Sequence, residues 1–157
     1  MARNRGPRLQ SSFELLITLS FGLAILMPLV VIAFIQLSNA NVSLSSIESQ
    51  QAASKLASTA TLIASEGAPA KQIVQISIPP NVRYIFIGNV TNGIGHEIIF
   101  EVSAASGLSY VTAYTPASVS GSLGGISSAG TYLVNVTAMS ACPSNTIMPC
   151  VYLSSKV

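Results

Sequence analysis

Charged residues are scarce in this sequence. Only 8% of its 157 residues are Asp, Glu, Lys or Arg, whereas 50% are hydrophobic and the mean hydropathy is +0.60. Soluble domains carry about 25% charged residues, so the composition excludes an ordinary cytosolic protein. The seven basic residues form no stripe that could displace counterions from a phosphate backbone. We therefore expect no nucleic-acid partner.

Residues that bind metals or catalyse reactions are equally few. His96 is the only histidine, and nothing nearby completes a four-ligand zinc set, so we expect no metal site and no cofactor. The chain has no nucleophile elbow, phosphate loop, HExxH or CxxC motif. His96 and Glu97 are adjacent at the start of a predicted strand and point to opposite faces, which leaves His96 as a solvated turn residue. Glu97 and Glu101 share the solvent face of that strand, and we expect that the protein is not an enzyme.

The only two cysteines, Cys142 and Cys150, lie near the C-terminus with seven residues between them. In a reducing compartment they are compatible with free thiols or with half of a metal site. Outside a membrane a disulfide bond is the simpler interpretation. It would join the last predicted strand to the preceding one and add roughly 2–3 kcal/mol on the chain-entropy model.

A long apolar run lies close to the N-terminus. From Leu15 to Leu37 the sequence reads LLITLSFGLAILMPLVVIAFIQL, without a charge, and about 20 apolar residues are enough to cross a bilayer as a helix. Three arginines precede the run within the first eight positions, whereas the first basic residue after it is Lys55. The positive-inside rule then predicts a single-pass membrane protein with a cytoplasmic N-terminus and the C-terminal domain outside.

A short motif, Gln10-Ser11-Ser12-Phe13-Glu14, stands between the basic segment and the apolar run. It resembles the Q-x-S-x-E signature of archaeal type IV pilin-like proteins with class III signal peptides. The resemblance implies that a prepilin-type peptidase cuts between Leu9 and Gln10 and leaves the helix on the mature protein. It also implies that Glu14 pairs with the new α-amino group of a neighbouring pilin-like subunit. Opposite charges attract strongly in a low-dielectric setting, and each is costly if unpaired.

Two alternatives stay open at this point. An interfacial Glu14 that reaches water is also compatible with a monomeric single-pass surface protein whose β-rich ectodomain binds a partner. Ser38-Asn39-Ala40 satisfies the small-x-small preference of secretory signal peptidase, which would release a domain that starts at Asn41. Against that cleavage, the apolar run exceeds the usual h-region of about 7–15 residues, and Glu14 opens it.

The helix is predicted to continue beyond the membrane, because residues 39–65 are rich in Ser, Ala and Gln and lack Gly and Pro. Apolar residues at helical spacing form a first stripe of Leu37, Ala40, Leu44 and Ile47 and a second, shifted stripe of Ala52, Leu56, Ala60 and Ile63. Gly67 then supplies a C-cap and Pro69 blocks continuation. We expect one helix from about Gln10 to Ala64, with the globular domain packed on its upper half.

The remaining chain alternates between short strand patterns and turn signals. Strands are predicted over Gln72–Ile78, Tyr84–Ile87, Glu97–Val102, Tyr110–Tyr114, Thr131–Met139 and Val151–Leu153, with turns that include Thr91–Gly93 and Gly121–Gly130. Repeated short strands of this kind favour an antiparallel sheet or small sandwich. The predicted fold class is thus α+β, with a long N-terminal transmembrane helix followed by a small antiparallel β-sheet or β-sandwich head.

These patterns divide the chain into four expected segments. They are a basic leader (1–9), a transmembrane helix (10–38), an extracytoplasmic continuation of the helix (39–66) and a β-rich extracytoplasmic domain (67–157). Three N-glycosylation sequons lie on the predicted outer side, at Asn41, Asn89 and Asn135. Asn89 precedes a turn and is expected to be exposed, whereas Asn135 lies in a predicted strand and is modifiable only if it faces solvent. Together with the resemblance, the sequence predicts a pilin-like structural subunit of an archaeal cell-surface filament.

Overall fold

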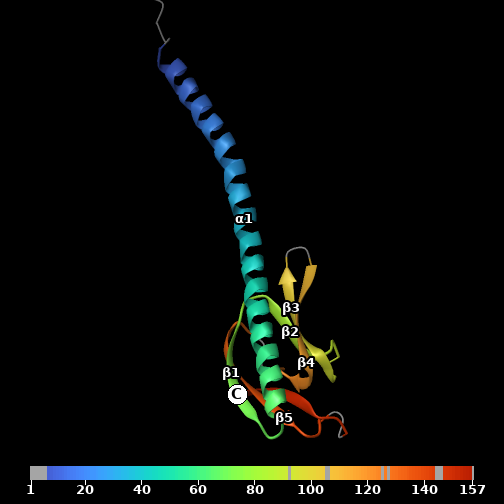
Figure 1. Ribbon diagram of the computed structural model, residues 1–157. Helices are drawn as coiled ribbons and strands as arrows, with labels where there is room; N and C mark the ends of the chain where they lie inside the picture. The colour runs from blue at the N-terminus through green and yellow to red at the C-terminus, as the bar shows by residue number, and fades with distance from the viewer. Residues whose placement is uncertain are drawn as a thin grey trace, which may run out of the picture. The chain divides into compact units, whose positions relative to one another are not determined.

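The computed structural model describes residues 7–91, 93–104, 107–124, 126, 128–143 and 147–156, and it describes side chains from Phe13 onward. One helix precedes six strands in the described residues, and Figure 1 shows how they are arranged. The elements are α1 (Pro7–Glu66), β1 (Lys71–Ile78), β2 (Val82–Gly88), β3 (Gly95–Ala104), β4 (Gly107–Ser122), β5 (Gly130–Met139) and β6 (Cys150–Lys156). The chain divides into two compact units, Met1–Ala40 and Asn41–Val157, so that α1 contributes to both.

The single long helix of the sequence analysis is confirmed. It continues through Pro28 and ends two residues later than predicted, at Glu66. The predicted cap is present: Gly67 has a φ of +76°, a left-handed conformation that glycine adopts without steric cost. The N–H of Gly67 donates to the carbonyl of Ile63 at 3.2 Å, so the last turn of α1 is closed by a backbone hydrogen bond.

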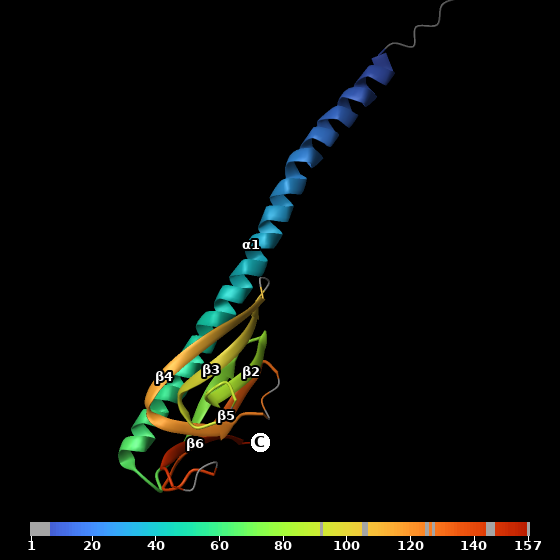
Figure 2. The same ribbon diagram turned by 90° about the vertical axis from the view of Figure 1, so that its right-hand side faces the viewer.

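The six strands form one sheet in the order β1-β5-β6-β4-β3-β2. All neighbouring strands are antiparallel except β4 and β6, which are parallel. Within the second unit the sheet lies across one side of the C-terminal part of α1 (Figure 2). The predicted α+β class, with a helix followed by a mostly antiparallel sheet, is confirmed.

The core of the second unit lies between α1 and the sheet. The second stripe of the sequence analysis is confirmed on the helix side: Ala52, Leu56, Ala60 and Ile63 are at most 5% exposed. Every strand contributes buried apolar side chains opposite them, among them Ile76, Ile87, Phe100, Val111, Val134 and Leu153. Two polar contacts join α1 to the sheet among the described residues. The hydroxyl oxygens of Thr61 on α1 and the fully buried Thr115 on β4 lie 3.0 Å apart, and the exposed Lys55 donates from Nζ to the carbonyl of Gln75 on β1 at 2.8 Å.

The first stripe takes no part in the contact with the sheet. Leu44 and Ile47 are 57% and 55% exposed, whereas the neighbouring Ser45 and Ser49 are buried. The physical reason is helical geometry, since positions 45, 49, 52 and 56 follow one another at spacings of three and four and form one continuous face. Small serines occupy the face that is turned to the rest of the unit, and the larger apolar side chains are left outside.

Strand β4 is longer than predicted. It runs on to Ser122, so the turn expected from Gly121 begins later. The strand contains Pro116 and gains a second neighbour along its length: residues 107–114 and Val119 pair with β3, with a register shift between Gly95 and Glu97, and Val119–Ser122 pair with β6. The turn assignment of His96 is also wrong, because this residue lies in β3, where its exposed ring places Nδ1 3.1 Å from the carbonyl oxygen of Ala117.

Candidate assembly site

The N-terminal unit exposes a continuous apolar surface. Its large apolar side chains from Phe13 to Leu37 are between 52% and 75% exposed. By length and composition, the helix is suited to crossing a membrane. The hydroxyl of Thr18 within this segment is satisfied locally, since it donates to the carbonyl oxygens of Glu14 and Leu15 at 3.0 Å each. An apolar surface of this kind needs lipid or protein around it, since water is a poor solvent for it.

Glu14 lies at the N-terminal end of this apolar surface and is the one acidic residue between Phe13 and Leu37. Its side chain is exposed, and among the described residues no cation lies within ion-pair distance of it. Leu9 and Gln10, which flank the predicted cleavage point, belong to the backbone of α1, and their side chains lie outside the described residues. The site therefore presents a carboxylate at one end of an uninterrupted hydrophobic helix.

The two cysteines form the predicted disulfide bond. The Cα atoms of Cys142 and Cys150 are 5.5 Å apart, and both residues are buried. The N–H of Cys142 also donates to the carbonyl of Met148 at 3.0 Å. The bridge fixes the segment between β5 and β6 at the end of the head where α1 ends, and it is the covalent bond that the sequence analysis expected between the last two strands.

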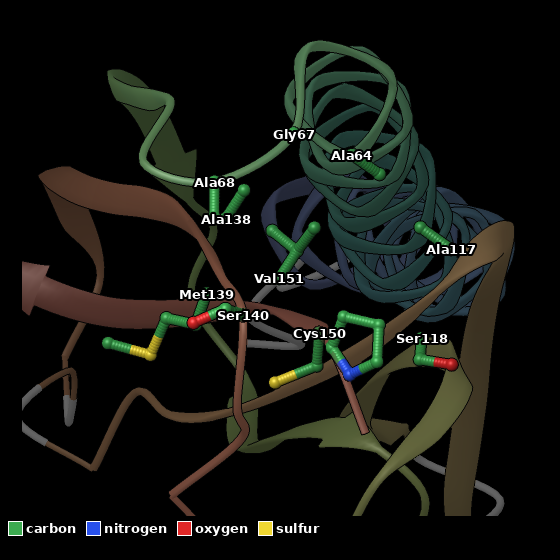
Figure 3. A pocket seen from close by; sticks show the side chains of 11 residues that line it. Ala64, Gly67, Ala68, Ala117, Ser118, Ala138, Met139, Ser140, Cys150 and Val151 are labelled. Carbon is green, nitrogen blue, oxygen red and sulfur yellow. The ribbon is translucent and has the colours of Figure 1, made fainter. Parts of the chain in front are cut away.

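A pocket of about 510 Å³ lies beside this disulfide, between the end of α1 and strands β4 to β6 (Figure 3). Alanines 64, 68, 117 and 138 form much of its wall, and Cys150 and Val151 line it from β6. None of its lining residues is charged, and its side-chain hydroxyls come from Ser118 and Ser140. Within the described part of the chain, no group of three or more His, Cys, Asp or Glu side chains is placed to hold a metal ion.

The three sequons occupy different environments. Asn41 is exposed on α1 at the start of the second unit. Asn89 lies in the β2–β3 connection, where its Oδ1 accepts hydrogen bonds from the N–H and hydroxyl of Thr91 and from the N–H of Gly93. Asn135 is half-buried in β5, and its Oδ1 is buried without a hydrogen-bond partner among the described residues. Asn41 thus presents its amide to solvent most openly.

One feature of the sheet was missed by the sequence analysis. Glu101 was expected on a solvent face, yet it is only 7% exposed. It lies on β3 directly between Tyr84 of β2 and Tyr110 of β4 in the strand register, and these two rings are 60% and 56% exposed. The burial comes from these neighbours, and the alignment of the three residues requires the hairpin registers, which the sequence pattern does not fix.

Comparison of the sequence with models of known protein families gave no match. Comparisons with curated proteins and with solved structures gave no significant match either. The architecture by itself is pilin-like: a long hydrophobic N-terminal helix whose C-terminal part packs against a mostly antiparallel sheet. The apolar helix and the disulfide indicate a membrane-anchored chain with an extracellular domain.

Proposed function

We propose that this protein is a pilin-like structural subunit of an archaeal cell-surface filament. The observation that carries the proposal is the apolar surface from Phe13 to Leu37, whose large side chains are all more than half exposed. This surface would contact lipid before assembly, and it would pack against the same surface of other copies after assembly. The leader over residues 1–9 would be removed by a prepilin-type peptidase between Leu9 and Gln10.

The second support is the placement of a single carboxylate at the start of that surface. Cleavage before Gln10 would make Glu14 the fifth residue of the mature chain and create a new α-amino group close by. A carboxylate and an ammonium group attract strongly once neighbouring helices exclude water. Their pairing between adjacent copies would set the axial register of the helices.

Leu44 and Ile47 extend this picture beyond the membrane. Both are more than half exposed on α1, although they belong to the unit that carries the sheet. Packing of α1 helices against one another would cover them, whereas a monomeric surface protein would leave them in water at a cost of roughly 25 cal/mol per Å² of apolar area. This favours the filament subunit over the monomeric binding protein.

The first test is the N-terminal residue of the protein purified from its native membrane, determined by mass spectrometry. A chain that starts at Gln10 is the expected result. A chain that keeps its first residues would refute the processing step and leave a single-pass surface protein. A start at Asn41 would instead identify a secreted domain.

The second test is Glu14→Ala, with Glu66→Ala as the matched control. Both residues lie on α1 with exposed side chains, but Glu66 ends the helix at the far side of the head. We expect Glu14→Ala to be cleaved and inserted normally and to lose surface filaments in electron micrographs, whereas Glu66→Ala keeps them. Filaments of normal number and length in Glu14→Ala would contradict the assigned role of this carboxylate.

A further inference from the structure

The face of the sheet turned away from α1 carries its charges in two separate groups. On β3 the side chains of Ile98, Phe100 and Val102 are fully buried in the core. Because successive strand residues point to opposite faces, Glu97, Ile99 and Glu101 lie on the outer face. We call the outer face of β2, β3 and β4 the acidic half and the outer face of β1, β5 and β6 the basic half.

The acidic half has a largely buried glutamate at its centre. Glu101 is 93% buried, since only 7% of it is exposed, and it forms no hydrogen bond or ion pair with any described residue. The carboxylate oxygens themselves are not fully enclosed, so they can be reached from outside. A carboxylate that is largely shielded from water gains free energy when a cation binds it. Glu101 is therefore an accessible acceptor for a cation from outside this copy of the chain.

The neighbours of Glu101 favour a cation as its partner. Tyr84 and Tyr110 lie on either side of it in the register, and Tyr114 is the register partner of Glu97, four residues away along β3. All three tyrosines are more than half exposed. The faces of aromatic rings attract ammonium and guanidinium groups. The tyrosine rings and the carboxylates of Glu97 and Glu101 therefore all favour a cationic side chain.

The basic half offers such groups. Lys71 begins β1 and Lys156 ends β6, and both side chains are exposed. They share the outer face, because Val74 and Ile76 on β1 and Leu153 on β6 mark the inner face by their burial in the core. Strands β1, β5 and β6 contain no Asp or Glu, so this half carries positive charge only.

One cation belongs to an acidic-half strand and could compete for Glu101. Arg83 lies on β2 at a register shift between Val82 and Tyr84, and its side chain is exposed. It makes no ion pair with Glu101 or with any other described residue. His96, at the start of β3, places its Nδ1 against the carbonyl of Ala117. Neither residue supplies the missing partner.

We propose that the acidic half of one copy binds the basic half of a second copy, and that Lys71 or Lys156 of that copy inserts its ammonium group between Tyr84 and Tyr110 against Glu101. The contact is heterologous, because two different surfaces meet. In such a contact each copy keeps one surface free for the next copy, so copies add on without end unless the rotation between successive copies closes them into a ring. The contact can therefore extend along a filament. The inference rests on the proposed function, which supplies the neighbouring copies.

Carbodiimide cross-linking of purified filaments tests the contact. This reagent activates a carboxylate, and an amine in contact with it then forms an amide bond as the urea leaves, so that contacting carboxylate–amine pairs are joined. These include Glu14 and the α-amino group that the proposed function places beside it, so the readout is the identity of the cross-linked peptides and not the gel ladder alone. We expect wild-type filaments, and the control Glu66→Gln, to yield peptides that join the Glu101 segment to Lys71 or Lys156, and Glu101→Gln to lose them. Wild-type filaments without such a peptide would overturn the inference.

A charge exchange provides the second test and guards against a folding defect. Glu101→Lys should lose the contact between the acidic and basic halves, and combining it with Lys71→Glu or Lys156→Glu should restore it, because every copy then carries the exchanged pair. A variant that only fails to fold would not be rescued by a charge change on another strand, so absence of rescue by both lysines refutes the contact. Wild-type chains that form no filaments would refute the proposed function, whereas filaments indifferent to Glu101 refute this inference alone.

Discussion

Replacing Leu56 by alanine tests whether the head depends on the C-terminal part of α1 for its core. Leu56 is fully buried against the sheet, whereas Leu62, six residues later on the same helix, is 52% exposed. The two substitutions remove the same atoms from the same helix and change helix propensity equally. Their difference therefore isolates the contribution of packing.

The magnitudes follow from burial. Truncation of a fully buried leucine costs about 2.7–5 kcal/mol, because a cavity remains where the side chain was. Leu62 keeps half of its surface in water, and its truncation should cost less than about 1 kcal/mol. For a domain of this size 1 kcal/mol corresponds to about 4 °C in Tm. A loss of about 3 kcal/mol in Leu56→Ala thus predicts a fall in Tm of about 12 °C.

Thermal unfolding of the full chain in detergent, followed by circular dichroism in the β-sheet region, measures both variants. We expect Leu56→Ala to unfold well below the wild type and Leu62→Ala to unfold within a few degrees of it. The helix signal from the N-terminal unit should change little, since that unit holds no core residue. Equal falls in Tm for the two variants would show that packing of Leu56 against the sheet does not stabilise the head.

Two further perturbations address the sheet. Replacing Cys142 and Cys150 together by serine should lower the free energy of unfolding by roughly 2–3 kcal/mol, since the nine-residue segment closed by the bridge gains freedom when unfolded; the Tm of this variant should not respond to reductant, while that of the wild type falls. Gly121→Ala should destabilise the head by about 1–3 kcal/mol, the usual cost of overpacking, because the added Cβ would overlap the carbonyl of Leu153 across the β4–β6 pair. Gly124→Ala is the control, since its Cβ meets only one side-chain oxygen, at 3.4 Å. Urea unfolding measures both variants, and equal midpoints would contradict the close approach of the strands.

Local patterns in the sequence predicted the elements well, because the residues that form them carry clear periodicities. The alternation in Gln72–Ile78 reappears as the alternating burial of Val74, Ile76 and Ile78 in β1. Gly67 marked the end of α1 within two residues, since its left-handed φ depends on a residue without a Cβ. The bond between Cys142 and Cys150 was predictable because the apolar run and the arginines before it placed both cysteines outside the membrane, where a disulfide is the simpler interpretation.

Features that depend on pairing between distant strands were beyond such patterns. The parallel β4–β6 pair joins Val119 to Val151, and nothing local distinguishes a parallel partner from an antiparallel one. The burial of Glu101 likewise follows from the register that places it between two tyrosines. The burial of Ser45 and Ser49 was also beyond the sequence pattern, because hydrophobicity alone does not say which face of a helix has room to approach a sheet, and here small serines continue that face.

The position of β6 in the sheet has a consequence for how the head folds. This strand comes after the other five in the chain, yet it lies between β5 and β4 in the strand order. Until residues 150–156 are in place, the sheet consists of two separate pieces, the antiparallel β1–β5 pair and the β4–β3–β2 meander, each with an open edge. Open edges invite pairing with other chains, and contacts between distant segments form slowly. The head is therefore completed by its C-terminal strand, and a deletion or bulky fusion there should leave two aggregation-prone halves on an intact helix.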